Sequence, residues 1–193
     1  MNFPEPTDVT GIVLAGGQAR RMQGKDKGLL PYQGRPLIEQ VCERLRPQVA
    51  RLCINANRHS ETYRRYGYPV FADQWPDYAG PLAGFYAALQ QCEGDWFCSV
   101  PCDTPYLPGD LVERLCAAAR REQVPLVSVS DGQRLHGTFC LLHRSCETAL
   151  LAYYEQGEHR VQKWIRSQPH AVVDYSDRPQ AMLNINEPQQ LDT

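Results

Sequence analysis

The sequence lacks a long apolar run and an excess of charge of either sign. No stretch approaches the roughly 18 apolar residues that a membrane span needs. The first ten residues contain neither Lys nor Arg, so they cannot begin a secretory signal. The 20 basic and 22 acidic residues leave a net charge of −2, which argues against a nucleic-acid coat or a polybasic membrane binder. We therefore expect a cytoplasmic protein that binds neither nucleic acid nor a membrane.

The eight cysteines lack the spacing of a metal or redox motif. None forms a C-x-x-C pair, so a zinc ribbon or a thioredoxin-like motif has no support. Most lie in apolar segments, where free cysteine behaves as a small hydrophobic residue. Because disulfides are rare in the cytoplasm, we expect reduced, structural thiols.

The chain also has no internal repeat, low-complexity tract or linker. Its 193 residues, of which 42% are hydrophobic, can build one sizeable core. We therefore expect a single domain over residues 1–193, with residues 1–8 flexible.

Short apolar runs alternate with helical stripes along the chain. The runs that predict buried strands are residues 9–15, 52–57, 69–73, 96–101 and 124–130. Helical spacing lies between them, in one case with Ser60 as the expected cap of a short helix. Such alternation favours a Rossmann-like α/β fold of three layers, in which a mostly parallel sheet has helices on both faces.

The second half of the chain departs from this rhythm. Asp131-Gly132 indicates a hairpin turn, so residues 136–142 are expected to add one antiparallel strand. Two further helices are expected near 145–156 and 161–165, and short strands at 171–174 and 181–186.

The segment after the first strand carries the strongest chemical signal. Glycines at 16, 17 and 24 allow the backbone to approach a ligand and present N–H groups to it. Four cations lie within eight residues: Arg20, Arg21, Lys25 and Lys27. At the carboxyl end of a strand this concentration suits a polyanion such as a triphosphate, although a solvated surface loop would have the same composition. Neither G-x-G-x-x-G nor a Gly-Lys-Ser/Thr loop occurs.

Asp103 follows the strand at 96–101 within Pro101-Cys102-Asp103-Thr104-Pro105. A carboxylate at this position points into the crevice where α/β folds bind ligands, and Mg²⁺ needs only one or two carboxylates plus phosphate oxygens. The alternative is a turn-forming Asp in a proline-rich corner. A nucleophilic role for Cys102 is disfavoured, because no His lies nearby in the sequence.

Four further polar residues fall at or near expected strand ends. Asp73 ends a strand and precedes Gly80-Pro81, a helix start with free N–H groups that can bind an anion. Asn55 ends the second strand. Asn184 and Asn186 would share one face of the last strand. Each also has a purely structural explanation, but together they would collect in one crevice.

These residues resemble the molybdenum cofactor guanylyltransferase type of nucleotidyltransferase. The signature loop is matched by Leu14-Ala15-Gly16-Gly17, Arg20-Arg21-Met22 and Asp26-Lys27. The resemblance continues through Asn55-Ala56-Asn57-Arg58-His59, Asp73, Gly80-Pro81-Leu82-Ala83-Gly84, the segment around Asp103, and Asn184-Ile185-Asn186. Gln23, where the family usually has glycine, and Gly137, where proline is expected, depart from the pattern.

The resemblance implies Mg²⁺-dependent transfer of GMP from GTP to the terminal phosphate of molybdopterin, with release of pyrophosphate. It also implies molybdoenzyme apoproteins and cofactor-handling proteins as recipients of the product. The catalytic residues would be Lys27, Asp103 and Arg21, with Asp103 also holding the metal. The nucleotide would contact Leu14, Ala15, Gly16, Gly17, Lys27, Asn55, Asp73 and Asp103. The molybdopterin would lie nearer Arg21, Gly80, Leu82, Asn184 and Asn186.

Two alternatives remain open at this point. One is a related nucleotidyltransferase that uses CTP or a sugar-1-phosphate acceptor, because the contacts that select the base cannot be seen in the sequence. The other is a non-catalytic nucleotide sensor or cofactor carrier with the same fold.

Overall fold

The structure is a computed structural model that describes residues 1–17, 26–75 and 80–185. Within these residues a seven-stranded sheet has the order β5-β4-β1-β6-β8-β7-β9. Only β8 runs antiparallel to its neighbours β6 and β7 in this sheet, and the other pairs are parallel. The sequence-based expectation of a mostly parallel sheet with one antiparallel strand is therefore confirmed.

The main-sheet strands are β1 (Val9–Leu14), β4 (Arg51–Asn55), β5 (Val70–Phe71), β6 (Trp96–Pro101), β7 (Leu126–Ser130), β8 (Leu135–His143) and β9 (Ala171–Asp174). The helices are α1 (Leu37–Leu45), α2 (Ser60–Arg64), α3 (Pro81–Gln91), α4 (Leu111–Glu122), α5 (Glu147–Glu155) and α6 (Val161–Ser167). A separate two-stranded hairpin joins β2 (Pro31–Tyr32) to β3 (Arg35–Pro36). In the described residues no helix has the length and apolar character needed to cross a bilayer.

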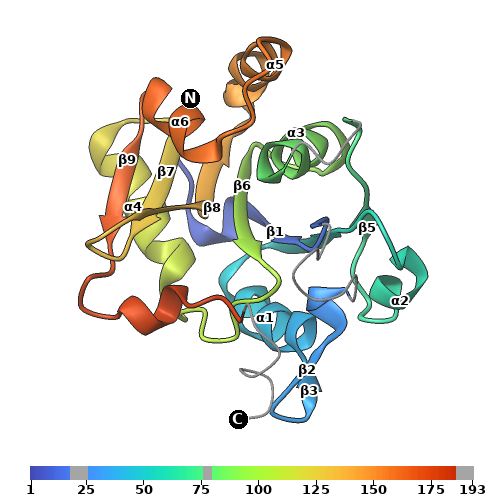
Figure 1. The fold of residues 1–193 in the computed structure, drawn as a ribbon. Helices are drawn as coiled ribbons and strands as arrows, with labels where there is room; N and C mark the ends of the chain where they lie inside the picture. The colour runs from blue at the N-terminus through green and yellow to red at the C-terminus, as the bar shows by residue number, and fades with distance from the viewer. Residues whose placement is uncertain (18–25, 76–79, 186–193) are drawn as a thin grey trace.

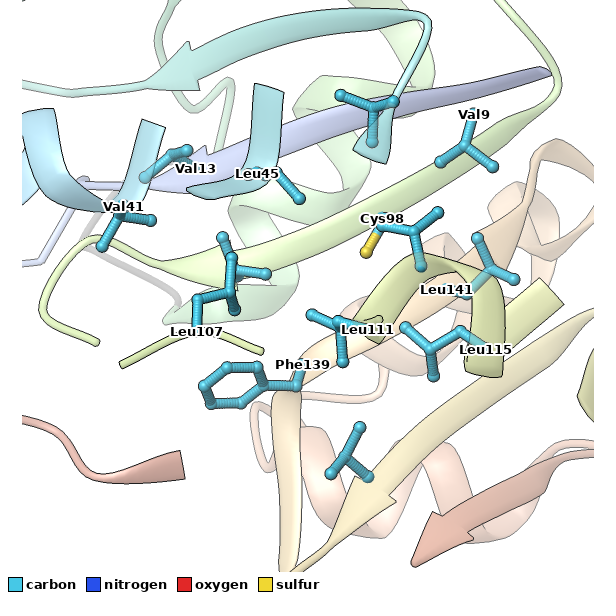
Figure 2. Close-up of a cluster of buried hydrophobic side chains, with 14 of the residues drawn as sticks. Val9, Val13, Val41, Leu45, Cys98, Leu107, Leu111, Leu115, Phe139 and Leu141 are labelled. Carbon is cyan, nitrogen blue, oxygen red and sulfur yellow. The ribbon is translucent and has the colours of Figure 1, made fainter. Parts of the chain in front are cut away.

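Figure 1 shows helices on both sides of the sheet. Two hydrophobic clusters lie between the sheet and these helices. One lies beneath α1, α2 and α4, and part of it is drawn in Figure 2, where Val41 of α1 and Leu111 of α4 face Val13 of β1 and Cys98 of β6. The other lies beneath α3, α5 and α6. Alternate residues of the inner strands enter opposite clusters, as the period-2 geometry of a strand requires, whereas β9 at the edge buries only one face. The helices therefore cover both faces of the sheet, as expected.

The first eight residues, for which the sequence predicts flexibility, contact the core. The carbonyl of Asn2 accepts a hydrogen bond from Trp96 Nε1 at 2.9 Å, and that of Pro4 accepts one from Arg120 at 2.8 Å. The Phe3 ring lies 6.1 Å from that of Trp96, measured between centroids. These contacts attach the N-terminal segment to the start of β6 and to α4.

Three local expectations were wrong or incomplete. Residues 179–182 form a 3₁₀ helix, and 183–185 form no strand, so the expected strand at 181–186 is absent from its described part. Met182 and Ile185 are both buried, and their spacing of three fits a 3₁₀ turn, whereas residues three apart in a strand point to opposite faces. Ser60 is the first residue of α2, and His59, in the left-handed region at φ +51°, precedes it. The hairpin β2–β3 was missed because each strand has only two residues.

Candidate active site

Four parallel strands end at the same level of the sheet. Leu14 at the end of β1 pairs with Asn55 of β4 on one side and with Pro101 of β6 on the other, and Asn55 pairs with Phe71 of β5. The chain passes from β1 outward to β4 and β5 and returns to β6 on the other side of β1. Open α/β sheets bind ligands at such a reversal. The polar residues after these strands therefore gather at one edge of the sheet.

Asp103 links the end of the first loop to the late segment of the chain. Its Oδ2 lies 2.7 Å from Lys27 Nζ, and its Oδ1 accepts a hydrogen bond from Asn184 Nδ2 at 2.7 Å. Its carbonyl accepts another from the Ile185 N–H at 2.9 Å. Thr104 closes the turn by donating to the Pro101 carbonyl at 2.9 Å. Asp103 is only 6% exposed, so this pair of charges is partly withdrawn from water and is stronger than a surface pair.

Asp73 is held by two amides. Its Oδ1 accepts from Asn55 Nδ2 at 2.8 Å and its Oδ2 from Asn57 Nδ2 at 2.6 Å. The Asp73 N–H in turn donates to Asn57 Oδ1 at 2.8 Å. A carboxylate has about four acceptor positions, so Asp73 retains capacity for a hydroxyl or N–H of a ligand.

Some backbone groups at and after the end of β1 form hydrogen bonds within the fold, and others are left for a ligand. The Ala15 N–H donates to the Asn55 carbonyl at 2.8 Å, and the Leu14 carbonyl accepts from the Cys102 N–H at 3.1 Å. These two groups are already used by the fold. In the part of the chain described, the N–H groups of Gly16 and Gly17 have no protein partner. The expected nucleotide contacts through this segment are therefore best placed at the two glycines.

The start of α3 lies at the same edge of the sheet. Gly80 has φ +76° and precedes Pro81, the first residue of the helix, so both residues suit their positions. The Leu82 side chain is fully buried in the cluster with Phe85. Leu82 can therefore offer a ligand only its backbone N–H, at a helix end that favours anions.

Two glycines allow the close packing around Asn55. A methyl group at residue 84 would lie 2.8 Å from both Asn55 Oδ1 and Leu14 Cδ2, and one at residue 16 would lie 3.0 Å from Asn55 Oδ1. These distances are shorter than ordinary van der Waals contacts. Glycine is therefore required where α3 and the first loop pass over the end of β4.

Cys102 does not have the environment of a nucleophile. It is 6% exposed, and burial raises the pKa of its thiol well above the ordinary value, with Asp103 and Asp26 adding to the effect. The thiol is therefore protonated near neutral pH and packs in the cluster beneath α1 and α4.

The donor set fits Mg²⁺ bound partly through its ligand. In the three described ranges no group of three or more His, Cys, Asp or Glu side chains could enclose a metal. Asp103 supplies one hard carboxylate, and Mg²⁺ is commonly bound by one or two such groups together with phosphates and water. Asp103 is thus compatible with a metal that arrives with a nucleotide.

Some predicted site residues lie outside the described ranges. Arg21 and Asn186 belong to this group, as does Gln23, where the signature loop departs from its usual pattern. Asn184 lies in a loop instead of a strand, so the expectation that two amides share a strand face does not hold at this residue.

Comparison with known proteins agrees with this geometry. Residues 11–172 match the model of the MobA-like NTP transferase domain. The chain belongs to the MobA-like NTP transferase family. The molybdenum cofactor guanylyltransferase of Vibrio parahaemolyticus is 42% identical over 187 residues, covering 97% of this chain and 95% of the relative.

Solved structures with this fold include other nucleotidyltransferases. Molybdopterin-guanine dinucleotide biosynthesis protein A of Archaeoglobus fulgidus has a TM-score of 0.78 at 19% identity, with 95% of each chain covered. The 4-diphosphocytidyl-2C-methyl-D-erythritolsynthase of Anaerococcus prevotii has a TM-score of 0.71 at 10% identity, with 97% of this chain and 94% of the other covered. At these identities the likeness concerns the fold alone.

Within the family motif, two residues had been given no role from the sequence. Asn57 contacts both Asp73 and Gly16, and Gly84 passes closest to Asn55. Both were visible in the sequence as parts of quoted motifs. Their function depends on contacts with residues 16 to 41 positions away, which spacing alone does not reveal.

Proposed function

We propose that this member of the MobA-like family transfers GMP from GTP to the terminal phosphate of molybdopterin and releases pyrophosphate. The observation that carries the proposal is the Lys27–Asp103–Asn184 cluster at the edge where β1, β4 and β6 end. It combines a cation for phosphates, a carboxylate for a metal and a late amide, and it does so in a chain that is 42% identical to a guanylyltransferase.

The reaction requires one phosphate to approach another. The acceptor phosphate is itself the nucleophile, so the protein need supply no covalent intermediate and no acid–base triad. It must hold the two reactants in line and neutralise the charge that develops at the α-phosphate and on the leaving pyrophosphate. Lys27 is proposed to contribute to this neutralisation, and Arg21 to assist it from the same loop.

The proposed Mg²⁺ would be held by Asp103. When bound, the ion supplies positive charge to the phosphates. Because Lys27 and Asn184 already contact the two carboxylate oxygens, binding of Mg·GTP requires Asp103 to share an oxygen or exchange Lys27 for the metal. Lys27 would then be released toward the phosphates, which is where the proposed catalysis needs it.

The remaining polar residues divide between the two substrates. Leu14, Ala15, Gly16 and Gly17 are proposed to line the nucleotide, with the backbone hydrogen bonds to GTP made at Gly16 and Gly17, and with Asn55 and Asp73 completing the nucleotide side. The acceptor side would be formed by Gly80 and Leu82 at the start of α3, with Arg21, Asn184 and Asn186. Asn184 contacts Asp103 directly, so the two sides meet at the proposed metal.

The test is a pyrophosphate-release assay with GTP, Mg²⁺ and molybdopterin. We expect release only when all three are present, with GMP recovered in a molybdopterin guanine dinucleotide. A parallel reaction contains CTP as a competitor. It tests base selectivity, because backbone hydrogen bonds to the base can discriminate strongly against the wrong nucleotide. Equal use of CTP would reassign the donor. Tight GTP binding without pyrophosphate release would favour a nucleotide sensor or carrier.

The proposal also covers where the reaction takes place and which proteins receive its product. We infer that it proceeds in the cytoplasm, where the eight cysteines would stay reduced, and that the product passes to molybdoenzyme apoproteins or cofactor-handling proteins. Copurification of the product with such a recipient would test this last step.

A further inference from the structure

Asn57 connects the first loop to the strand end at Asp73. Its Nδ2 lies 3.1 Å from the Gly16 carbonyl oxygen and 2.6 Å from Asp73 Oδ2, while its Oδ1 accepts from the Asp73 N–H at 2.8 Å. An amide side chain has two donors and one acceptor oxygen. Both polar atoms of Asn57 are therefore engaged, and its orientation is fixed by three contacts.

This contact fixes a peptide group as well as an atom. The Gly16 carbonyl and the Gly17 N–H belong to one planar trans peptide, in which they point in opposite directions. Because Asn57 draws the carbonyl to its own side, the Gly17 N–H points away from Asn57. A methyl group at residue 16 would lie 2.8 Å from Asn57 Nδ2, so the backbone rests directly on the amide.

The next carbonyl is held from the same segment. Arg58 Nη2 lies 3.3 Å from the Gly17 carbonyl oxygen. Residues 57 and 58 thus contact two successive carbonyls of the loop, and both contacts come from the segment that follows β4. Glycine has the largest backbone freedom of any residue. Contacts from outside the loop therefore restrict the backbone of a Gly-Gly pair more than that of any other pair.

We propose that Asn57 is a positioning residue for the nucleoside triphosphate: it presents the Gly17 N–H to the ligand by holding the Gly16 carbonyl. The inference rests on the proposed function, because it takes GTP as the ligand of this loop. Asn57 itself does not touch the reacting atoms. Its contribution is to binding, since its hydrogen bonds go to Gly16 and Asp73 and not to the Lys27–Asp103 pair that the chemistry uses.

The experiment compares Asn57→Ala with Gln91→Ala. Gln91 is the matched control, because its amide donates to the Ala72 carbonyl at 3.0 Å, one residue before Asp73, and it has no hydrogen bond with the described residues of the loop, Gly16 and Gly17. We expect Asn57→Ala to raise the Kd and KM for GTP about tenfold, the effect of losing one charged or well-placed hydrogen bond. Its kcat should stay within about threefold of the wild-type value, and Gln91→Ala should change neither constant.

A second comparison separates the loop contact from the Asp73 contact. Asn57→Ala is introduced into an Asp73→Ala background, in which the contact with the Asp73 carboxylate is already lost, while those with the Gly16 carbonyl and the backbone N–H of residue 73 remain. We expect a further loss of GTP affinity of at least about threefold. If the double variant binds GTP as Asp73→Ala does, Asn57 acts only through Asp73 and the proposal is overturned.

Protein stability and direct binding complete the test. A merely structural role would lower Tm and the amount of active enzyme while leaving KM for GTP unchanged, and that result contradicts the proposal. If Asn57→Ala does not fold, Asn57→Ser is used, because its hydroxyl ends one bond short of the Gly16 carbonyl and should weaken GTP binding similarly. GTP titration measures nucleotide binding without an acceptor. If the wild-type protein binds GTP but transfers no GMP, the proposed function is contradicted and the role of Asn57 in GTP binding is not.

Discussion

Tyr63 and Asp26 form a hydrogen bond inside the core, with 2.5 Å between the hydroxyl oxygen and Oδ1. Tyr63 has no exposed surface, and Asp26 is 8% exposed. Burial raises the pKa of Tyr63, and the neighbouring Cys102 and Asp26 add to the effect, so the hydroxyl remains a donor. Asp26 precedes Lys27 directly. The bond therefore anchors the end of the basic loop at the residue before the proposed catalytic lysine.

Tyr63→Phe should weaken both the fold and the reaction. It leaves the ring in place but removes the donor of a buried carboxylate, which costs about 1–3 kcal/mol of unfolding free energy. Because the backbone next to Lys27 loses its anchor, we expect kcat to fall by about tenfold. Urea unfolding and steady-state kinetics measure the two effects. Tyr66→Phe, on the adjacent turn after α2, is the control and should change kcat little.

Strand ends were the most predictable part of this site. The buried strands are short, largely apolar and separated by helical stripes, so the positions of Asn55, Asp73 and Asp103 after them could be inferred from the sequence. That inference needs only the topology of a parallel sheet. The structure adds the register, which places Leu14, Asn55 and Pro101 side by side.

The connections within the site were not predictable in the same way. The contact of Lys27 with Asp103 joins residues 76 positions apart, and that of Asn184 with Asp103 joins residues 81 apart. Asn184 was expected on a short strand over residues 181–186, whereas the chain forms a 3₁₀ turn and a loop there. Tertiary contacts, here with Asp103, override such weak local preferences.

Lys27→Ala should reduce turnover by about 10²–10³, the usual effect of losing one preorganised group that stabilises charge in the transition state. The Lys27 Nζ–Asp103 Oδ2 distance of 2.7 Å places the ammonium at the proposed metal carboxylate. Lys163→Ala is the control, because Lys163 pairs with Glu158 on the surface. Single-turnover kinetics give the chemical step directly. Turnover equal to that of the wild type would remove Lys27 from the proposed machinery.

Asp103→Asn should change the response to Mg²⁺. The substitution keeps the size of the side chain and can still accept from Asn184, but it removes the charge that a hard cation needs. We expect the Mg²⁺ concentration for half-maximal activity to rise at least about tenfold, with lower maximal turnover. Asp110→Asn is the control. Asp110 lies directly before α4, and its carboxylate pairs with Arg178. A Mg²⁺ titration that superimposes on the wild-type curve would place the metal elsewhere.

Gly84→Ala should destabilise the protein although alanine is the better helix former. Alanine gains about 1 kcal/mol of helix propensity. Its methyl group, however, would lie 2.8 Å from Leu14 Cδ2 and from Asn55 Oδ1, and overpacking of this kind costs about 1–3 kcal/mol. We expect a net loss of roughly 1 kcal/mol and a higher KM for GTP, because Asn55 must move. At Gly109 a methyl group meets nothing within 4 Å, so Gly109→Ala is the control. A rise in Tm for Gly84→Ala would contradict the packing argument.

Asp131 should make stability depend on acidic pH. Its Oδ1 accepts from the N–H groups of Gln133 at 2.9 Å and Arg134 at 2.8 Å, and its Oδ2 lies 2.7 Å from His136 Nε2. Burial alone would raise the pKa of Asp131, but these hydrogen bonds outweigh it and hold the pKa well below its usual range. The stabilisation is therefore complete above the unfolded-state pKa of about 3.9 and is lost as the pH falls toward the folded-state value.

Asp131→Asn tests this relationship, because asparagine does not titrate. At pH 6 the variant should be less stable than the wild type by about 1–3 kcal/mol, the contribution of hydrogen bonds to a charged group. Between about pH 4 and pH 2 the difference should shrink, since the wild-type carboxylate becomes protonated. Asp177→Asn, which changes a carboxylate whose side chain is 63% accessible, is the control. Urea unfolding at each pH measures the free energies, and a constant difference between wild type and Asp131→Asn would show that Asp131 is not the titrating group.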